Sequence, residues 1–209
     1  MVDAYLRRSP LAHMHLEARA VADAAIADAS VELAEIRHLD MLNLRGDATD
    51  AAFLSAVSSV IGTEPTTAPN TSAKGKDGIF ILGLGPDEWL IVTQPSKGGN
   101  VANALSTALA GQFATVVHVG DGRTTIRVSG PNARDVLAKG TAVDLHPSAF
   151  GTGQCAQTTI ARTGALIHCL EAGRDIPDTF QVIVAASFAE YLWTWLEDAG
   201  REYGVRVNN

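Results

Sequence analysis

The sequence predicts an α+β fold in which antiparallel hairpins pack against helices. Three observations lead to this prediction. Short apolar segments repeatedly flank turn residues, amphipathic helical segments are interspersed among them, and 46% of the 209 residues are hydrophobic, which is enough to bury a substantial core. We expect one compact domain over residues 30–209, preceded by an N-terminal arm over residues 1–29.

The arm is predicted from an alanine-rich segment that has apolar residues in places but no firm period. His13 and His15 lie within it, but the further ligands that a metal site requires are not apparent in its sequence. We therefore interpret residues 1–29 as a segment that is ordered by contact with a partner or with its own domain.

Local periodicity and turn residues predict the helices, strands and loops of the first part of the domain. Period-two alternation indicates strands, apolar residues spaced three and four apart indicate helices, and Pro, Gly, Ser and Thr clusters indicate loops. In chain order, we expect strands with a break over 30–44, a helix capped by Thr49 and ended by Gly62, a loop over 63–78, a hairpin over 79–92 that turns at 85–87, a helix capped by Asn100, and strands over 114–120 and 124–130.

The second part continues with a short helix and another hairpin. Pro131 is expected to begin the helix, because its fixed φ suits the first helical turn, and Gly140 is expected to end it. A hairpin over 154–172 is predicted to turn at Thr163-Gly164, and a further strand follows over 179–186.

The last helix has the clearest pattern in the chain. Ser187 and Glu190 have the spacing of a capping box. The expected apolar face consists of Phe188, Tyr191, Leu192, Trp195, Leu196 and Ala199. Trp193 lies off that face, so we expect it to be exposed and available as a contact for a partner.

Composition and charge argue against several functional classes. The net charge of −7 argues against nucleic-acid binding, which depends on clustered Lys and Arg. No apolar run approaches the roughly 20 residues that cross a bilayer, and the N-terminus lacks the apolar core of a signal peptide, so we expect a cytoplasmic protein without membrane contact. Cys155 and Cys169 fit neither a redox nor a zinc spacing, which indicates packed free thiols.

Residues 140–158, GTAVDLHPSAFGTGQCAQT, have the residue types of a nucleophilic site. Asp144, His146 and Ser148 invite interpretation as a hydrolytic triad, but triad members normally come from separated parts of a chain. Pro147 also breaks the strand that would align them. The simpler interpretation is a turn in which Asp144 accepts backbone N–H bonds.

Two other features could in principle carry chemistry. Cys155 lies in a predicted strand, without a nearby basic helix end to activate its thiol, and is expected to be part of the core. Arg123, Arg127 and Arg134 would line a pocket for an anion if the fold brings them together, but salt bridges to acidic surface residues are the commoner outcome.

Several motifs together resemble the gamma subunit family of heterotetrameric sarcosine oxidase. The run RTTIRVSGPNARDVLAKGTAVDLHPSAFGTGQCAQTTIA, the later SFAEYLWTWLEDAGREYG and the upstream GLGPDEWLIV carry the resemblance, which covers roughly residues 30 to 205. Its distinctive parts are Gly130-Pro131, Asp144-Leu145-His146-Pro147, Phe150 with Gly153, and Ser187-Phe188-Ala189. Thr141 departs from the family, in which cysteine often follows the glycine.

The resemblance implies a fold similar to the folate-binding domain of aminomethyltransferases, in a shortened form. It also implies a complex that demethylates sarcosine oxidatively to glycine and yields hydrogen peroxide with formaldehyde or 5,10-methylenetetrahydrofolate. In the family, the alpha and beta subunits carry FAD, covalent FMN, NAD and the tetrahydrofolate site, and the delta subunit binds zinc. The gamma subunit has no assigned cofactor or catalytic residue.

The function that we expect is therefore that of a non-catalytic subunit, with alpha, beta and delta subunits as partners and no catalytic, cofactor or metal site in this chain. The residues expected to form the family motif and a possible subunit interface are Arg123, Arg127, Gly130, Pro131, Arg134, Asp144, His146, Pro147, Phe150, Gly153 and Trp193. The alternatives are a folate-binding one-carbon protein or aminomethyltransferase-like enzyme that acts alone and, third, a hydrolase that uses the triad residues.

Overall fold

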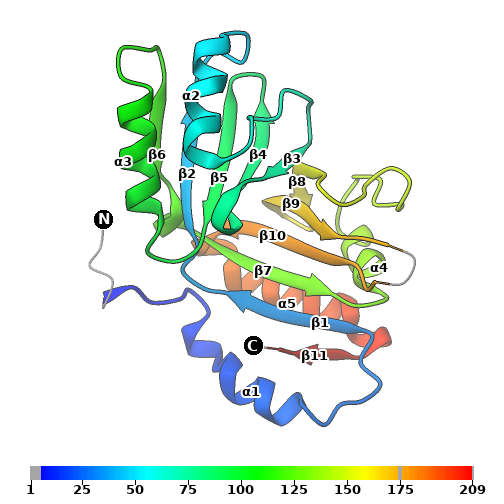
Figure 1. Cartoon of the computed structure of the whole chain (residues 1–209). Coiled ribbons are helices and arrows are strands. Elements are labelled where there is room, and N and C mark those ends of the chain that lie inside the picture. Colours follow the sequence, from blue (N-terminus) through cyan, green and yellow to red (C-terminus); the bar gives the residue numbers. More distant parts are fainter. Residues whose placement is uncertain (1–5, 174–175, 209) are drawn as a thin grey trace. The chain divides into compact units, whose positions relative to one another are not determined.

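A computed structural model describes residues 6–173 and 176–208 and divides them into two compact units (Figure 1). Residues 38–121 belong to the first unit, and residues 6–37 and 122–208 belong to the second. Each unit has its own sheet and its own cluster of buried apolar side chains. The sequence predicts a single domain over 30–209 instead, because local alternation does not tell one sheet from two.

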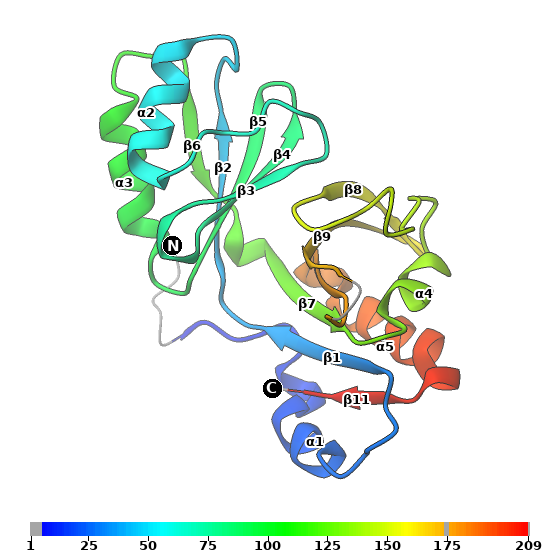
Figure 2. The ribbon, with the colours of Figure 1, turned by 45° about the vertical axis from the view of Figure 1, so that its right-hand side comes forward.

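The first unit is a five-stranded antiparallel sheet with helices α2 and α3 side by side on one face (Figures 1 and 2). The strand order is β3-β4-β5-β2-β6. The elements are β2 Asp40–Arg45, α2 Ala51–Ile61, β3 Ser72–Lys74, a 3-10 turn Lys76–Gly78, β4 Phe80–Gly85, β5 Glu88–Thr93, α3 Gly98–Ala108, β6 Thr115–His118 and a 3-10 turn Gly120–Gly122. The predicted strands and helices are confirmed, but the loop over 63–78 also contains the short β3.

Both helices of this unit begin at residues other than the predicted caps. Asp50, not Thr49, is the N-cap of α2, and its carboxylate accepts the N–H of Ala52 at 2.8 Å. In α3, the predicted cap Asn100 lies inside the helix, because Asp40 of β2 accepts the N–H of Gly98 at 3.0 Å. A capping group from a distant strand leaves no local sequence signal.

The second unit is a six-stranded sheet of order β11-β1-β7-β10-β9-β8. Its strands pair antiparallel except β11, which runs parallel to β1. The elements are a 3-10 turn Ala12–Met14, α1 Leu16–Asp23, β1 Val31–Ile36, β7 Arg123–Ser129, α4 Ala133–Ala138, β8 Cys155–Ile160, β9 Thr163–Glu171, β10 Thr179–Ala185, a 3-10 turn Ala186–Phe188, α5 Ala189–Gly200, a 3-10 turn Arg201–Tyr203 and β11 Val205–Val207.

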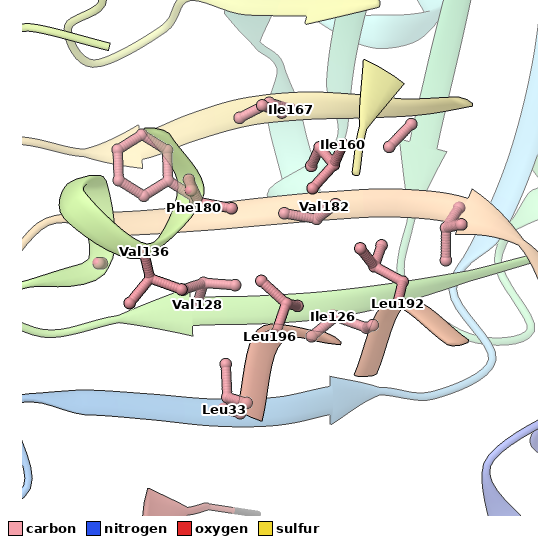
Figure 3. Close-up of a cluster of buried hydrophobic side chains, with 14 of the residues drawn as sticks. Leu33, Ile126, Val128, Val136, Ile160, Ile167, Phe180, Val182, Leu192 and Leu196 are labelled. Carbon is pink, nitrogen blue, oxygen red and sulfur yellow. The ribbon is translucent and has the colours of Figure 1, made fainter. Parts of the chain in front are cut away.

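The core of this unit lies between one face of the sheet and helices α4 and α5 (Figure 3). Alternate strand residues point into it: Leu33 from β1, Ile126 and Val128 from β7, and Val182 from β10. Leu11 and Leu16 from the predicted arm are also buried in this cluster. Burying an aliphatic side chain of this size stabilises a fold by roughly 1.5–3 kcal/mol, so the contact orders residues 11–16.

Helix α5 is rotated relative to the sequence prediction, and Trp193 is the consequence. Trp193 is 0% exposed and belongs to the core, so the prediction that it is exposed is wrong. Phe188 and Tyr191, which were expected to face inward, are instead 47% and 40% exposed. Ser187 makes no capping bond to the helix. Two stripes of α5 fit helical spacing, and packing against the sheet selects the one that contains Trp193.

The turns of this unit also deviate by a few residues. The β8–β9 hairpin turns at Ala161-Arg162, not at Thr163-Gly164, and Ala161 has φ 52°. Helix α4 begins at Ala133, two residues after Pro131.

Candidate functional site

The Gly130-Pro131 motif joins β7 to α4 at a close approach of two chain segments. Gly130 has φ 115°, and a Cβ at this position would meet the carbonyl oxygen of Ser30 at 2.4 Å. The N–H of Gly130 donates to the carbonyl oxygen of Asp178 at 3.1 Å. Only glycine combines this dihedral with this approach, so the motif is explained by backbone geometry.

Arg134, in the first turn of α4, ties three segments together. Its Nε and Nη2 donate to the carboxylate of Asp178 at 2.6 and 3.1 Å, and its Nη1 donates to the backbone oxygens of Phe150, at 2.8 Å, and Leu145. The guanidinium lies 5.0 Å from the ring centroid of Phe180. The side chain is only 10% exposed, and four of its five N–H donors are directed at groups of this chain.

Asp144, His146 and Ser148 do not form a triad. Asp144 accepts the backbone N–H of His146 at 2.9 Å, not a ring N–H, so Asp144 does not orient the imidazole as a triad requires. His146 Nδ1 and Ser148 Oγ are 2.7 Å apart, and the same Nδ1 accepts the backbone N–H of Ser148 at 3.2 Å. The three side chains therefore shape an exposed turn, as the simpler interpretation predicts.

The rest of the motif supports that turn. Phe150 is 4% exposed, and its ring stacks on Phe180 at a centroid distance of 6.5 Å. Gly153 has φ 83°, and its N–H donates to the carbonyl oxygen of Cys169 at 2.9 Å. Pro147 begins the turn over 147–149, directly before Phe150. Phe150 thus fills an apolar site.

The three arginines are not brought together. Arg123 and Arg127 share the face of β7 opposite to Ile126 and Val128, which point into the core. Arg134 lies on the core side, over Phe180. The face with Arg123 also contains Thr125 and Gln181, and a buried polar atom of both Arg123 and Thr125 has no hydrogen-bond partner in the described part of the chain. A single anion pocket built from all three arginines is therefore excluded by strand alternation.

Burial shifts the pKa of two titratable groups of the sheet. Burial lowers the pKa of His168 to about 4, and a side-chain hydrogen bond with Gln181 acts in the opposite direction. Burial raises the pKa of the Cys169 thiol to about 11, and Cys155 is buried and not in a disulfide. A thiol that remains protonated at pH 7 is a poor nucleophile. No group of three or more metal-ligand side chains occurs among the described residues.

Surface hollows occur in both units, and two of them have exposed aromatic residues in their lining. A groove of about 950 Å³ follows α5 in the second unit and is lined by Tyr191, Trp195 and the ion-paired side chains of Arg19 and Glu197. A hollow of about 630 Å³ in the first unit lies beside Phe113, whose side chain is fully exposed. Neither hollow was predicted from the sequence, although an aromatic residue in a turn sequence such as Gly-Gln-Phe was a usable signal. No helix in the described segments is long and apolar enough to cross a membrane.

Fold and site together define a small α+β protein whose motif residues are structural. The fold is shared with the glycine-cleavage aminomethyltransferase of Bartonella henselae, with a TM-score of 0.71 at 16% identity over 97% of this chain and 59% of that one. The sequence profile of the sarcosine oxidase, gamma subunit family matches residues 45–202, so the chain belongs to this family.

Individual relatives agree with this assignment. The gamma subunit of sarcosine oxidase from an Arthrobacter species is 32% identical over 95% of this chain and 92% of the relative. A chain of heterotetrameric sarcosine oxidase from Corynebacterium sp. U-96 superposes with a TM-score of 0.81 at 29% identity, over 95% of this chain and 96% of that one. The expected family and fold class are thereby confirmed.

Proposed function

We propose that this chain is a non-catalytic subunit of a heterotetrameric sarcosine oxidase complex, in which it keeps the alpha and beta subunits in register. The observation that carries the proposal is the match to nearly the full length of a chain from such a complex. The motif residues support a structural role, because their hydrogen bonds are made within this chain. Arg134 donates to Asp178 and to a backbone oxygen, and Asp144 accepts a backbone N–H.

The chemistry of the proposed complex belongs to the partner subunits. We assign FAD, FMN, NAD and tetrahydrofolate to the alpha and beta subunits and zinc to the delta subunit. The described part of the chain has no cluster of three metal ligands. Its glycines Gly83 and Gly85 are followed by strand β5, whereas a phosphate-binding glycine loop is followed by a helix. A cytoplasmic location for the complex is in keeping with the two free cysteines.

Omission of this chain tests the proposed function. The other three subunits are co-expressed with and without it, the native mass of the assembly is measured, and hydrogen peroxide formation from sarcosine is followed. We expect the assembly to be incomplete and turnover to be lost without this chain. Normal assembly and normal turnover in its absence would contradict the proposal.

The second candidate is a folate-binding one-carbon protein or aminomethyltransferase that acts alone. The likeness in fold to the Bartonella henselae enzyme favours it, but this chain spans only 59% of that enzyme. Titration of the purified chain with tetrahydrofolate, followed by calorimetry, separates the two candidates. Saturable binding without partners would favour the second candidate, and no binding at concentrations up to millimolar would remove it.

A further inference from the structure

The hollow of the first unit, hereafter the turn hollow, is built by three turns at one end of the sheet. These are the β2–α2 turn over 46–50, the β4–β5 turn at 86–87 and the α3–β6 connection over 112–115. Figures 1 and 2 show all three at the same end. Its volume of about 630 Å³ is large enough for one or two side chains of another protein.

Backbone contacts hold the walls of the turn hollow in place before anything binds. The N–H of Gly46 donates to the carbonyl oxygen of Asp87 at 3.1 Å, which ties the first wall to the second. Thr115 pairs with Arg45 across the β2–β6 ladder, which ties the third wall to the first. A rigid hollow avoids the entropic cost of ordering loops on binding.

Exposed apolar side chains continue the turn hollow along β6. Phe113 is 102% exposed, so its ring contacts nothing in the described chain that excludes water from it. Val117, two residues after Thr115 on the same face of β6, is 52% exposed. Strand β6 is also the edge of the sheet and has no Lys, Pro or bulge to protect it. Aromatic and apolar groups gathered at an open edge are typical of protein interfaces.

The charge around the turn hollow selects the kind of partner. Two carboxylates belong to its lining, those of Asp47 and Asp87. The one guanidinium beside them in the described lining, that of Arg45, is already paired with Glu88 at 2.7 Å and approaches Asp87 at 3.7 Å. A second copy of this chain, with a net charge of −7, would bring like charges together. The complementary partner is a surface with Lys or Arg around an apolar side chain.

We propose that the turn hollow, Phe113 and Val117 form the docking surface for another subunit of the oxidase complex, an inference that rests on the proposed function. That subunit inserts an apolar side chain into the hollow, covers Phe113, and places Lys or Arg residues opposite Asp87 and Asp47. The interaction surface follows from the juxtaposition of a preformed hollow, a fully exposed aromatic ring and an excess of carboxylates.

Binding of the full chain to the complex of the other three subunits tests this surface. Phe113→Ala removes the exposed ring, and Phe188→Ala is the matched aromatic control in the second unit. Asp87→Lys reverses a charge at the hollow, and Glu64→Lys, an exposed acidic residue of the same unit, is its control. We expect Phe113→Ala to weaken affinity by about tenfold or more and Asp87→Lys to slow association by about tenfold. Both controls are expected to change affinity less than about twofold.

Each outcome decides a separate question. If the wild-type chain does not bind the other subunits, the proposed function fails. If it binds and the Phe113 and Asp87 variants behave like their controls, or Phe188→Ala weakens binding instead, only this surface is wrong. The same conclusion follows if Phe113→Ala abolishes self-association of the chain and leaves the complex intact. Thermal unfolding of Phe113→Ala should match wild type, because the lost ring is entirely exposed.

Discussion

Replacement of Arg134 is the sharpest test of the structural interpretation of the motif. Arg134→Met retains most of the apolar stem but removes the guanidinium that bonds Asp178 and the backbone oxygens of Leu145 and Phe150. The Arg134 and Asp178 side chains are 10% and 17% exposed, so Asp178 and both carbonyls are left largely without water. Removing one partner of a buried pair costs about 3–5 kcal/mol. We expect about 3 kcal/mol, since Asp178 retains some access to solvent.

Urea unfolding of the purified chain, followed by tryptophan fluorescence, measures this loss. Trp193 and Trp195 lie in the unit that Arg134 stabilises, and hydrogen exchange over residues 144–151 reports on the turn itself. Arg162→Met, at an exposed position, is the matched control and should change the free energy of unfolding by less than about 0.5 kcal/mol. Arg134→Lys retains the charge but not the planar fork, so it should fall between Arg134→Met and wild type.

A double-mutant cycle separates the ion pair from the backbone contacts. Combining Arg134→Met with Asp178→Asn should cost at least about 1 kcal/mol less than the sum of the two single changes, because no charge is left unpaired. A loss below about 1 kcal/mol for Arg134→Met, or additive effects in the cycle, would refute the assignment of Arg134 as the clamp of this turn.

Three further predictions concern individual residues. Gly130→Ala should destabilise the chain by about 2 kcal/mol in thermal unfolding, because φ is 115° and the new Cβ meets a carbonyl oxygen, whereas Gly164→Ala, which meets nothing within 4 Å, should be close to neutral. His168 has a folded pKa of about 4, below its ordinary value of 6.5, so about 3 kcal/mol of stability present above pH 6.5 should be lost as the pH falls to 4. His168→Gln should flatten this part of the pH profile of urea unfolding. A profile that the substitution leaves unchanged would contradict the assignment of this loss to His168. Ser148→Ala should leave sarcosine turnover of the assembled complex unchanged, and a loss of more than tenfold would revive the triad interpretation.

Elements with a local signal were predictable. Gly62 ends α2 with φ 85°, and the alternating residues of β7 form a strand, because each pattern depends on backbone preferences within a few residues. The motif residues were likewise predictable as a turn, because Asp144 accepts the N–H group two residues ahead of it. The cap of α2 was misplaced by one residue, since Thr49 and Asp50 are both competent and only the chain path selects Asp50.

Long-range packing decided the features that have no local signal in the sequence. Arg134 and Asp178 are 44 positions apart, so nothing in their neighbourhoods marks them as a pair. The rotation of α5 about its axis depends on which of its two apolar stripes packs into the core. Packing against the sheet buries the stripe that contains Trp193. The turn hollow combines three turns that are spread over residues 46 to 115. Local sequence determines backbone conformation because its energies arise between neighbours in the chain. Which faces are buried, and which remain open to a partner, is decided by contacts between segments that meet only when the chain folds.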